Sequence, residues 1–346
     1  MPVSRFLRFI LWFVLAPCAM QDAALAAELA NLTLASTATM TDLPMFIAQS
    51  RGYFKEEGVV VSIVQFDSGA RMMPALASGE IDVATGGTSA GFYNAIARGM
   101  GIRVVADKSR TPPGRHAQAL LVRKALIDSG RVKTLSDFKG LRVASAAIGS
   151  SAMATLNRLY RLAGLTSGDI ERVYLGVPQQ IAAMTNGAVD AAMPTEPVAS
   201  EIERQGVAVR FMNDDEIYPD HQISVMFYSD QLRRQRREAA LGFMRGYLRG
   251  VRAQNASIVN GRLSGPDTDE FTRLIAANTP VKDVALLREV TMSDNSGDGL
   301  LNIDSLREDY EVYRAEGLLE GEGRFADSLD LSFAREAVAE LAARTK

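Results

Sequence analysis

The sequence is poor in the residues on which redox and metal chemistry depend. Its 346 residues include one cysteine and two histidines. One cysteine cannot close an internal disulfide, and two histidines make a multi-ligand zinc or iron site hard to assemble. An excess of one charge is also lacking, because 38 Lys and Arg stand against 41 Asp and Glu, a net charge of -3. Nucleic-acid-binding surfaces normally show a basic excess, so we expect a small-molecule partner and no nucleic acid. From the shortage of cysteine and histidine we expect no metal, and we expect no cofactor.

The first residues have the pattern of an export signal. Arg5 and Arg8 precede the apolar run 9–16, and the small residues 23–27 supply an A-x-A cleavage site. We predict a signal peptide at residues 1–26 and a periplasmic mature protein. The apolar run is shorter than the roughly 20 residues that span a bilayer, which disfavours an uncleaved anchor. Pro17 argues against lipid attachment at Cys18, so the mature chain is expected to contain no thiol.

An internal repeat divides the chain into two similar units. Residues 75–84 and 183–192 lie 108 positions apart, and each segment is typical of a helix closed by glycine, an aspartate in the turn and a short buried strand. The same offset places the strand 32–36 on 140–144. Each unit is therefore predicted to be a strand-helix-strand-helix-strand unit with a parallel sheet.

Two irregular stretches, 107–116 and 213–221, are predicted to be crossings between the units. The predicted fold is α/β, with two lobes joined by a two-crossing hinge. Lobe one comprises residues 27–108 and 223–346, including carboxyl-terminal helices, and lobe two comprises 109–222. Residues 223–228 are predicted to form a strand. Residues 229–256 are predicted to form one helix, with the arginine cluster 233–237 on a solvated face.

The loops that follow the predicted strands are rich in glycine and hydroxyl residues. Ligands of open parallel sheets bind beyond the carboxyl ends of the strands, where helix N-termini favour anions. The ligand-binding candidates in these loops are Met40, Thr41, Leu43, Ser68, Gly69, Gly87, Thr88, Ser89, Gly149, Ser150, Ser151, Gln179, Thr195 and Glu196. His116 and His221, at the two crossings, complete the set. The alternative is that the loop residues only cap their helices and that both histidines are ordinary surface residues.

Charged residues near the first crossing have two interpretations. Lys108, Arg110 and Arg115 either supply charge to an anionic ligand or form a solvated linker face, which is the default expectation. Residues 294–299 are spaced like a calcium loop, but Ser305 stands where the bidentate glutamate belongs, so helix capping is favoured. We find no nucleophile paired with a base, and no catalytic residue is expected.

Four segments resemble a known family: residues 42–59, which contain Gly-Tyr-Phe-Lys-Glu-Glu-Gly at 52–58; residues 75–84 with Gly86-Gly87-Thr88; Leu-Ser-Asp-Phe-Lys-Gly at 135–140; and residues 187–197. They are similar to the substrate-binding proteins of nitrate/sulfonate/taurine-type ABC importers. The resemblance implies a type II periplasmic binding protein fold that closes on a small organic solute and delivers it to a membrane permease. We expect an anionic solute and a monomeric protein.

The same superfamily includes thiamine-pyrimidine synthases, which are enzymes with a cysteine-rich motif. The predicted mature chain has no cysteine, so we expect a protein that is not an enzyme. A receptor that binds a ligand and signals to a membrane sensor is the remaining alternative.

Overall fold

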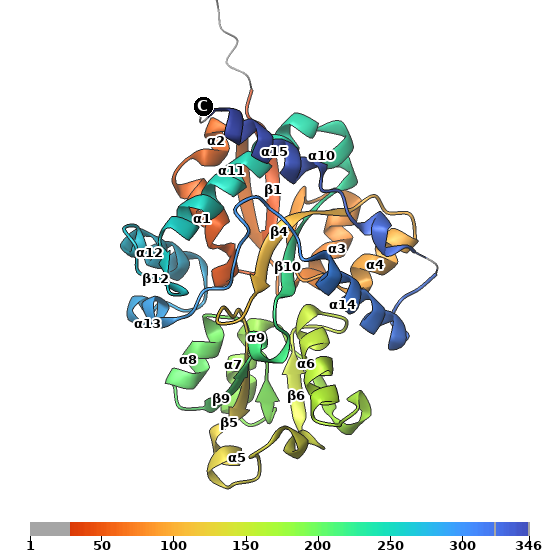
Figure 1. Ribbon diagram of the computed structural model, residues 1–346, viewed down its shortest axis with the longest axis vertical. Helices are drawn as coiled ribbons and strands as arrows, with labels where there is room; N and C mark the ends of the chain where they lie inside the picture. Colours follow the sequence, from red (N-terminus) through yellow and green to blue (C-terminus); the bar gives the residue numbers. More distant parts are fainter. Residues whose placement is uncertain (1–27, 322, 345–346) are drawn as a thin grey trace, which may run out of the picture.

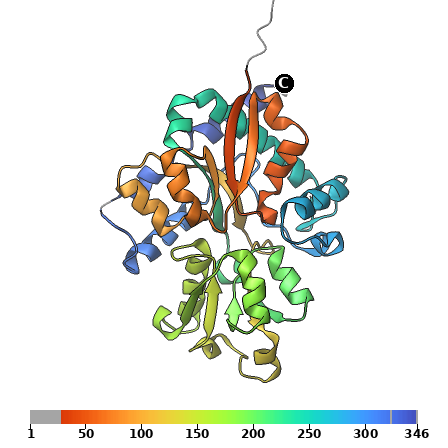
Figure 2. The same cartoon turned by 180° about the vertical axis from the view of Figure 1, so that it is seen from behind.

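The computed structural model describes residues 28–321 and 323–344, so the predicted signal peptide and Cys18 lie outside the described residues. Two lobes lie one above the other along the long axis (Figure 1). Seen from behind, they are again separate bodies joined near the middle (Figure 2). Both described ends of the chain lie on lobe one, on the side remote from lobe two.

Each lobe is built on a five-stranded sheet. In lobe one the strand order is β2-β1-β3-β10-β4, and in lobe two it is β7-β6-β8-β5-β9. The strands are β1 (Ala30–Ser36), β2 (Val59–Gln65), β3 (Val83–Gly86), β4 (Arg103–Thr111), β5 (Ala119–Arg123), β6 (Arg142–Ser145), β7 (Glu171–Tyr174), β8 (Ala191–Ala192), β9 (Ala208–Asn213) and β10 (His221–Tyr228), with a small hairpin of β11 (Ile258–Val259) and β12 (Arg262–Leu263).

Helices cover both sheets. Those up to and including the second crossing are α1 (Leu43–Ser50), α2 (Tyr53–Glu56), α3 (Gly69–Ser78), α4 (Ala90–Ala97), α5 (Lys124–Asp128), α6 (Ser151–Leu162), α7 (Val177–Thr185), α8 (Val198–Arg204) and α9 (Asp214–Ile217). The later ones are α10 (Asp230–Gln235), α11 (Arg237–Ala256), α12 (Thr268–Asn278), α13 (Val284–Glu289), α14 (Ile303–Ala315) and α15 (Ser332–Arg344), and all six pack around lobe one (Figure 1).

The predicted parallel units are present in both lobes, but the sheets are mixed. β1 pairs in parallel with β2 and β3, and β6 pairs in parallel with β7 and β8. The strands next to the crossings run the other way, since β10 is antiparallel to β3 and β4, and β5 is antiparallel to β8 and β9. The predicted parallel pairing is therefore confirmed within the repeated units, and the strands that carry the chain from lobe to lobe, outside these units, make each sheet mixed.

The repeat is visible in the backbone contacts of its two aspartates. The amide of Asp82 donates to the Thr33 carbonyl at 3.0 Å, and the Asp82 carboxylate accepts from the Thr33 amide at 2.9 Å. Asp190 makes the same pair of contacts with the backbone of Arg142, at 2.8 and 3.0 Å. In each lobe the aspartate thus fixes the turn before the third strand to the first strand of the same unit.

The predicted helix over 229–256 is interrupted. α10 ends at Gln235 and α11 begins at Arg237, because Arg236 leaves the helical region with φ -131°. Two arginines of the expected solvated cluster instead link elements of lobe one: Arg236 pairs with Asp82 at 3.0 Å and Arg233 with Asp330 at 3.2 Å.

Glycines let α11 lie close to its neighbours. A Cβ atom at Gly242, Gly246 or Gly250 would collide with Glu57, Phe54 or Pro44, respectively. The four-residue spacing puts all three glycines on one face of the helix, which packs on α1 and α2.

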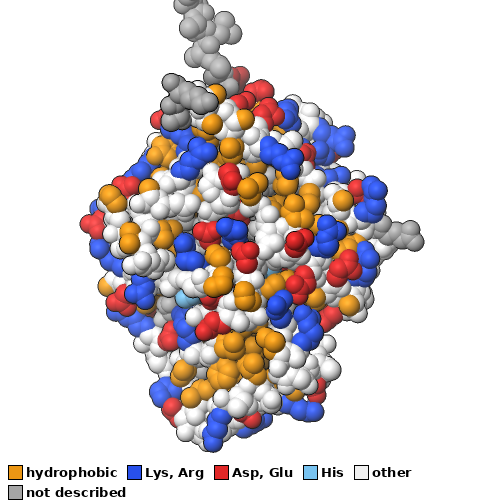
Figure 3. All heavy atoms as spheres, in the orientation of Figure 1, with side chains coloured by type: hydrophobic (Ala, Val, Ile, Leu, Met, Phe, Trp, Pro, Cys, Tyr) orange, Lys and Arg blue, Asp and Glu red, His pale blue; other side chains and the backbone are white. Residues whose placement is uncertain are grey.

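The surface carries both signs of charge. On the face shown in Figure 3, basic and acidic side chains are interspersed over both lobes. None of the helices in the described part of the chain combines the length and the apolar character of a bilayer span.

Candidate ligand-binding site

A cavity of about 80 Å³ lies between the lobes. Lobe one contributes the loops after β1, β2 and β3, and lobe two contributes the loops after β6, β7 and β8, so the site lies where the parallel units predict it. Residues from the crossings and from β10 close the remaining side, among them Lys108, Ala117, Gln118, Ile223 and Ser224.

Four helices begin at this cavity. Residues at or next to the N-termini of α3 and α4 line it from lobe one, and residues at the start of α6 and α7 line it from lobe two. The first amides of a helix have no partner within the helix, and the helix dipole places partial positive charge there. Helix ends that converge from both lobes make the cavity favourable for an anion.

Some of the serines at these helix ends are already occupied as caps. The hydroxyl of Ser89 accepts from the Phe92 amide at 3.2 Å, and that of Ser150 accepts from the Met153 amide at 3.3 Å. Ser68, at the start of α3, makes no such bond. Ser89 and Ser150 therefore cap their helices as well as line the cavity, and Ser68 differs from both.

Three residues of the cavity lining each have a buried polar atom without a hydrogen-bond partner: Ser68 Oγ, Gln118 Oε1 and Ser224 Oγ. These residues are 6, 6 and 7% exposed. Buried polar atoms are nearly always paired, and an exception needs an explanation. The three residues belong to lobe one, the segment after the first crossing and β10, so unsatisfied polar groups from separate parts of the fold gather around this cavity.

A buried ion pair lies in the cavity wall. Lys108 Nζ is 2.6 Å from Asp42 Oδ1, and both side chains are at most 1% exposed. The second oxygen of Asp42 accepts from the Thr39 amide at 2.9 Å, and Thr85 donates its hydroxyl to the first at 3.3 Å. Lys108 is the one Lys or Arg among the described lining residues. The expectation of a solvated linker face is therefore wrong for Lys108.

The lobes are closed on each other. The Ala90 amide at the start of α4 donates to the Gly149 carbonyl of lobe two at 3.1 Å, and the Met40 amide donates to the Glu196 carbonyl at 3.2 Å. Gly87 lies against lobe two so closely that a Cβ atom there would overlap the Ser151 side chain. Backbone contacts therefore bridge the cleft on both sides of the cavity.

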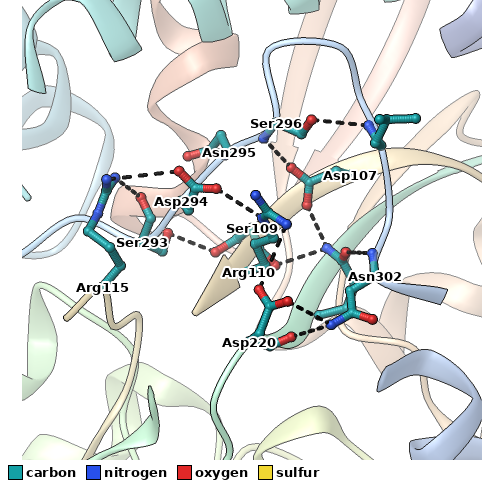
Figure 4. A network of polar contacts seen from close by, with 12 residues as sticks. Asp107, Ser109, Arg110, Arg115, Asp220, Ser293, Asp294, Asn295, Ser296 and Asn302 are labelled. Atoms are coloured by element: carbon teal, nitrogen blue, oxygen red, sulfur yellow. Dashed lines mark hydrogen bonds and ion pairs between the residues drawn. The ribbon is translucent and has the colours of Figure 1, made fainter. Parts of the chain in front are cut away.

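Arg110 and Arg115 belong to a polar network at the hinge instead (Figure 4). Arg110 Nε donates to Asp294 at 2.9 Å, and Arg115 donates to the carbonyls of Met292 and Ser293 at 2.6 and 2.7 Å. These contacts hold the segment 292–302, which we call the strap, against the first crossing. Asp294, a residue of the calcium-like spacing, thus serves as an arginine partner.

The strap also holds the second crossing (Figure 4). Asn302 donates to the Asp220 carbonyl at 2.7 Å. The Ser296 amide donates to Asp107 at 2.7 Å. Asp107 lies next to Lys108, and burial raises the pKa of its carboxyl group to about 7.

Neither histidine lines the cavity. His221 is fully buried at the hinge, where Nε2 is 2.8 Å from Asp309 Oδ2 and Nδ1 is 3.1 Å from Thr155 Oγ1. His116 lies in a separate hollow beside Arg210 and Thr291, and burial lowers the pKa of its imidazole. His221 is therefore held within the hinge, and neither histidine is placed to contact a solute in this cavity.

The structure divides the predicted site residues into two groups. Those that line the cavity are Thr41, Ser68, Gly69, Gly87, Ser89, Ser150, Ser151 and Thr195. Those that do not line it are Met40, Leu43, Thr88, Gly149, Gln179, Glu196, His116 and His221. Met40 and Leu43 pack in a hydrophobic cluster, and Glu196 pairs with Arg210 at 2.8 Å.

Other lining residues were not predicted. They are Thr37, Thr39, Asp67, Ala70, Gly86, Ala117, Gln118, Ala146, Ala152, Val177, Ile223 and Ser224, whereas Lys108 had been considered as a source of charge for an anionic ligand. Several belong to the loops that the repeat identifies, which is the signal that could have found them. Gln118, Ile223 and Ser224 lie beside the crossings, outside the repeated units.

Comparisons with known proteins give relatives of two kinds. The chain is 34% identical over 154 residues to a putative aliphatic sulfonates-binding protein of Escherichia coli (strain K12), covering 44% of this chain and 45% of the relative. It is 30% identical over 184 residues to the taurine-binding periplasmic protein of the same organism, covering 53% of each. It is also 28% identical over 166 residues to the 4-amino-5-hydroxymethyl-2-methylpyrimidine phosphate synthase of Aspergillus parasiticus, covering 46% of this chain and 44% of that protein. The chain spans about half the length of the curated relatives it matches.

A solved structure extends the likeness to nearly the whole chain. The alkanesulfonate-binding protein of Xanthomonas axonopodis pv. citri, bound to MOPS, superposes with a TM-score of 0.70 at 20% identity, covering 88% of this chain and 99% of that one. At this identity the likeness shows the fold alone, and it confirms the predicted periplasmic binding protein fold. A family model matches residues 40–256, more than half of the chain, from the first cavity loop through both crossings to the end of α11. The predicted relationship is thereby confirmed, and the chain belongs to the NMT1/THI5-like family.

Proposed function

We propose that this protein is a periplasmic solute-binding protein, which captures a small organic anion between its lobes and delivers it to the permease of an ABC importer. The observation that carries the proposal is the interlobe cavity, which is bordered by four helix N-termini and lined by three residues that have an unpartnered buried polar atom. The sulfonate- and taurine-binding relatives support the same class of solute. Closure of two lobes around a bound solute is a common way for binding proteins to exclude water.

The lining residues favour a small aliphatic solute. Among the described lining residues, most are Gly, Ala, Ser or Thr and none is aromatic. A pyrimidine or an aromatic acid would find no ring to stack on. A cavity of about 80 Å³ has room for more than one water-sized group, since one such group needs roughly 10–15 Å³. A compact oxyanion with a short aliphatic tail fits these limits.

We propose a binding role without catalysis. The synthase relative belongs to a class for which the resemblance implies a cysteine-rich motif, and the one cysteine of this chain lies outside the described residues. Besides hydroxyls, the described lining contains one lysine that is already paired with a carboxylate, the carboxylate of Asp67, and no histidine. Asp67 is about half exposed and lies 3.6 Å from Arg71, and no lining hydroxyl is hydrogen-bonded to it among the contacts of the described residues. A serine or threonine that is not paired with a base is a weak nucleophile.

A thermal-unfolding screen tests the solute class. The panel contains aliphatic sulfonates, nitrate, aromatic carboxylates and pyrimidines, and a ligand at about 100 times its dissociation constant stabilises the fold by roughly 2.7 kcal/mol. We expect the aliphatic anions to raise the midpoint. Ser68→Ala should weaken binding of the best anion, whereas Ser78→Ala, at the exposed other end of α3, should not. Midpoints raised by pyrimidines alone, or consumption of a panel compound by the protein, would contradict the proposal.

Delivery needs a separate measurement. Vesicles that contain the permease and ATPase of an ABC importer for this anion, taken from the same organism, should accumulate the bound anion only when the protein is added. Equal accumulation without the protein would contradict a role in transport and would favour the alternative, a receptor that signals to a membrane sensor.

A further inference from the structure

The positive and negative side chains at the cavity balance one another. The charged residues among its described lining are Lys108 and Asp67. Asp42 lies behind Lys108 at 2.6 Å and neutralises it. Asp67 is about half exposed and lies 3.6 Å from Arg71. The side chains around the cavity therefore supply no surplus positive charge, and the attraction for an anion comes from helix N-termini and hydroxyl groups.

Such a site treats singly and doubly charged anions differently. The cost of moving an ion out of water rises with the square of its charge, whereas its attraction to fixed dipoles rises in proportion to the charge. A second negative charge therefore raises the desolvation cost about fourfold and the gain from the helix ends about twofold. A cationic side chain without a counter-charge in the cavity wall would offset this extra desolvation cost.

Asp42 removes the surplus positive charge that Lys108 would otherwise give to the cavity wall. Its side chain is fully buried, does not line the cavity, and is held by the Thr39 amide and the Thr85 hydroxyl as well as by Lys108. These contacts hold the carboxylate beside the lysine. We infer that Asp42 is a specificity-determining residue, which cancels the charge of Lys108 and makes the site select singly charged over doubly charged anions. The inference rests on the proposed function and goes beyond it by assigning the charge of the solute to one residue.

Two ligands of the same shape separate charge from size. Ethyl sulfate carries one negative charge at every pH from 5.5 to 8, whereas ethyl phosphate carries mostly one at the lower pH and almost entirely two at the higher, because its second ionisation lies between them. Titration calorimetry of the full mature protein should show binding of ethyl sulfate at both pH values. The affinity for ethyl phosphate should fall at least tenfold more than that for ethyl sulfate between pH 5.5 and 8. Any titration of the protein itself affects both ligands, so the ratio of the two affinities reports the ligand charge.

Variants of Asp42 and Lys108 test whether Asp42 causes this preference. Asp42→Asn keeps the shape but removes the negative charge, and we expect it to improve the affinity ratio at pH 8 at least tenfold in favour of ethyl phosphate. Asp42→Asn combined with Lys108→Gln returns the pair to neutrality and should restore the wild-type preference.

Each outcome is decisive. A folded Asp42→Asn protein with an unchanged ratio overturns the inference and leaves the proposed function intact, as does a wild-type protein that binds both ligands equally at pH 8. Failure of the wild type to bind either anion overturns both proposals. If the single variant does not fold, the wild-type pH comparison and the neutral double variant decide the matter.

Discussion

Arg172 of β7 and Glu316, which directly follows α14, form an ion pair between the lobes at 3.0 Å, outside the cavity. Asn157 of α6 donates to the same carboxylate at 2.9 Å, and Arg158 pairs with Glu308 of α14 at 3.0 Å. α14 also packs on lobe one, where Tyr313 donates to the Thr88 carbonyl beside the cavity. α14 is therefore a bridge that favours the closed arrangement without contacting the solute.

Loss of this bridge should weaken binding. Glu316→Gln removes the charge of a partly buried pair worth about 1 kcal/mol, which shifts the population toward open lobes and raises the dissociation constant about fivefold. Calorimetry with the best anion of the screen measures the change. Glu320→Gln is the control, because Glu320 pairs with Arg98 within lobe one at an exposed site. Equal weakening by both variants would contradict a role in closure.

Closure should also fail when Gly87 carries a side chain. A Cβ atom there would overlap Ser151 of lobe two, so Gly87→Val should keep the lobes apart and reduce affinity at least tenfold. Gly91→Val offers a control on the first turn of α4, where a Cβ atom meets only Ser89 at an ordinary distance of 3.8 Å. Small-angle scattering should show that ligand compacts the wild type and Gly91→Val but not Gly87→Val. Compaction of all three proteins would contradict this prediction, because it would mean that the lobes close despite the added side chain.

Titration of Asp107 should make stability fall as pH rises. Burial raises the pKa of its carboxyl group from an ordinary 3.8 to about 7, so between these values the folded state holds a proton that the unfolded state has released. Stability is then highest at the acid end of this range and falls by at most about 1.4 kcal/mol per pH unit up to pH 7, where the contribution ends. Asp107→Asn should flatten this slope, as measured by denaturant unfolding from pH 4.5 to 8. The exposed Asp304→Asn should not, and parallel slopes for wild type and Asp107→Asn would refute the assignment.

A buried carboxylate far from the cavity should affect stability without affecting binding. Glu57 contacts Arg245 at 2.6 Å and Arg344 at 2.8 Å, and its side chain is 3% exposed. Glu57→Gln leaves the buried Arg245 without one of its counter-charges, so the free energy of unfolding should fall by about 3 kcal/mol. Glu56→Gln, which removes a more exposed partner of Arg249, is the matched control. Calorimetry should give wild-type affinity for both variants at a temperature where they are folded.

The repeat made the fold predictable, because it shows the same turn twice. Gly79 and Gly187 both adopt positive φ, at 79° and 75°, as the closing glycines of helices do. The direction of the strands beside the crossings was not predictable, since a β10 sequence of buried apolar residues has the same pattern in either orientation. The break at Arg236 also escaped prediction, because the pattern continues through it.

The cavity loops were predictable from the strand ends, but the charge of the site was not. Lys108 is buried only because Asp42, 66 positions earlier, meets it. Its neighbours Arg110 and Arg115 pair instead with a strap about 180 positions later in the chain. Pairings over such distances leave no local pattern. For the same reason, capping by Ser89 and its absence at Ser68 could not be distinguished from sequence.

The place of β10 in its sheet has a consequence for the order of folding. β10 lies between β3 and β4 and pairs with both, yet it follows all of lobe two in the chain. The edges of β3 and β4 that face each other therefore stay unpaired until residues 221–228 emerge, and unpaired edges invite wrong partners. The five strands of lobe two lie within residues 119–213, so its sheet can assemble first. Lobe one begins earlier in the sequence and is completed later.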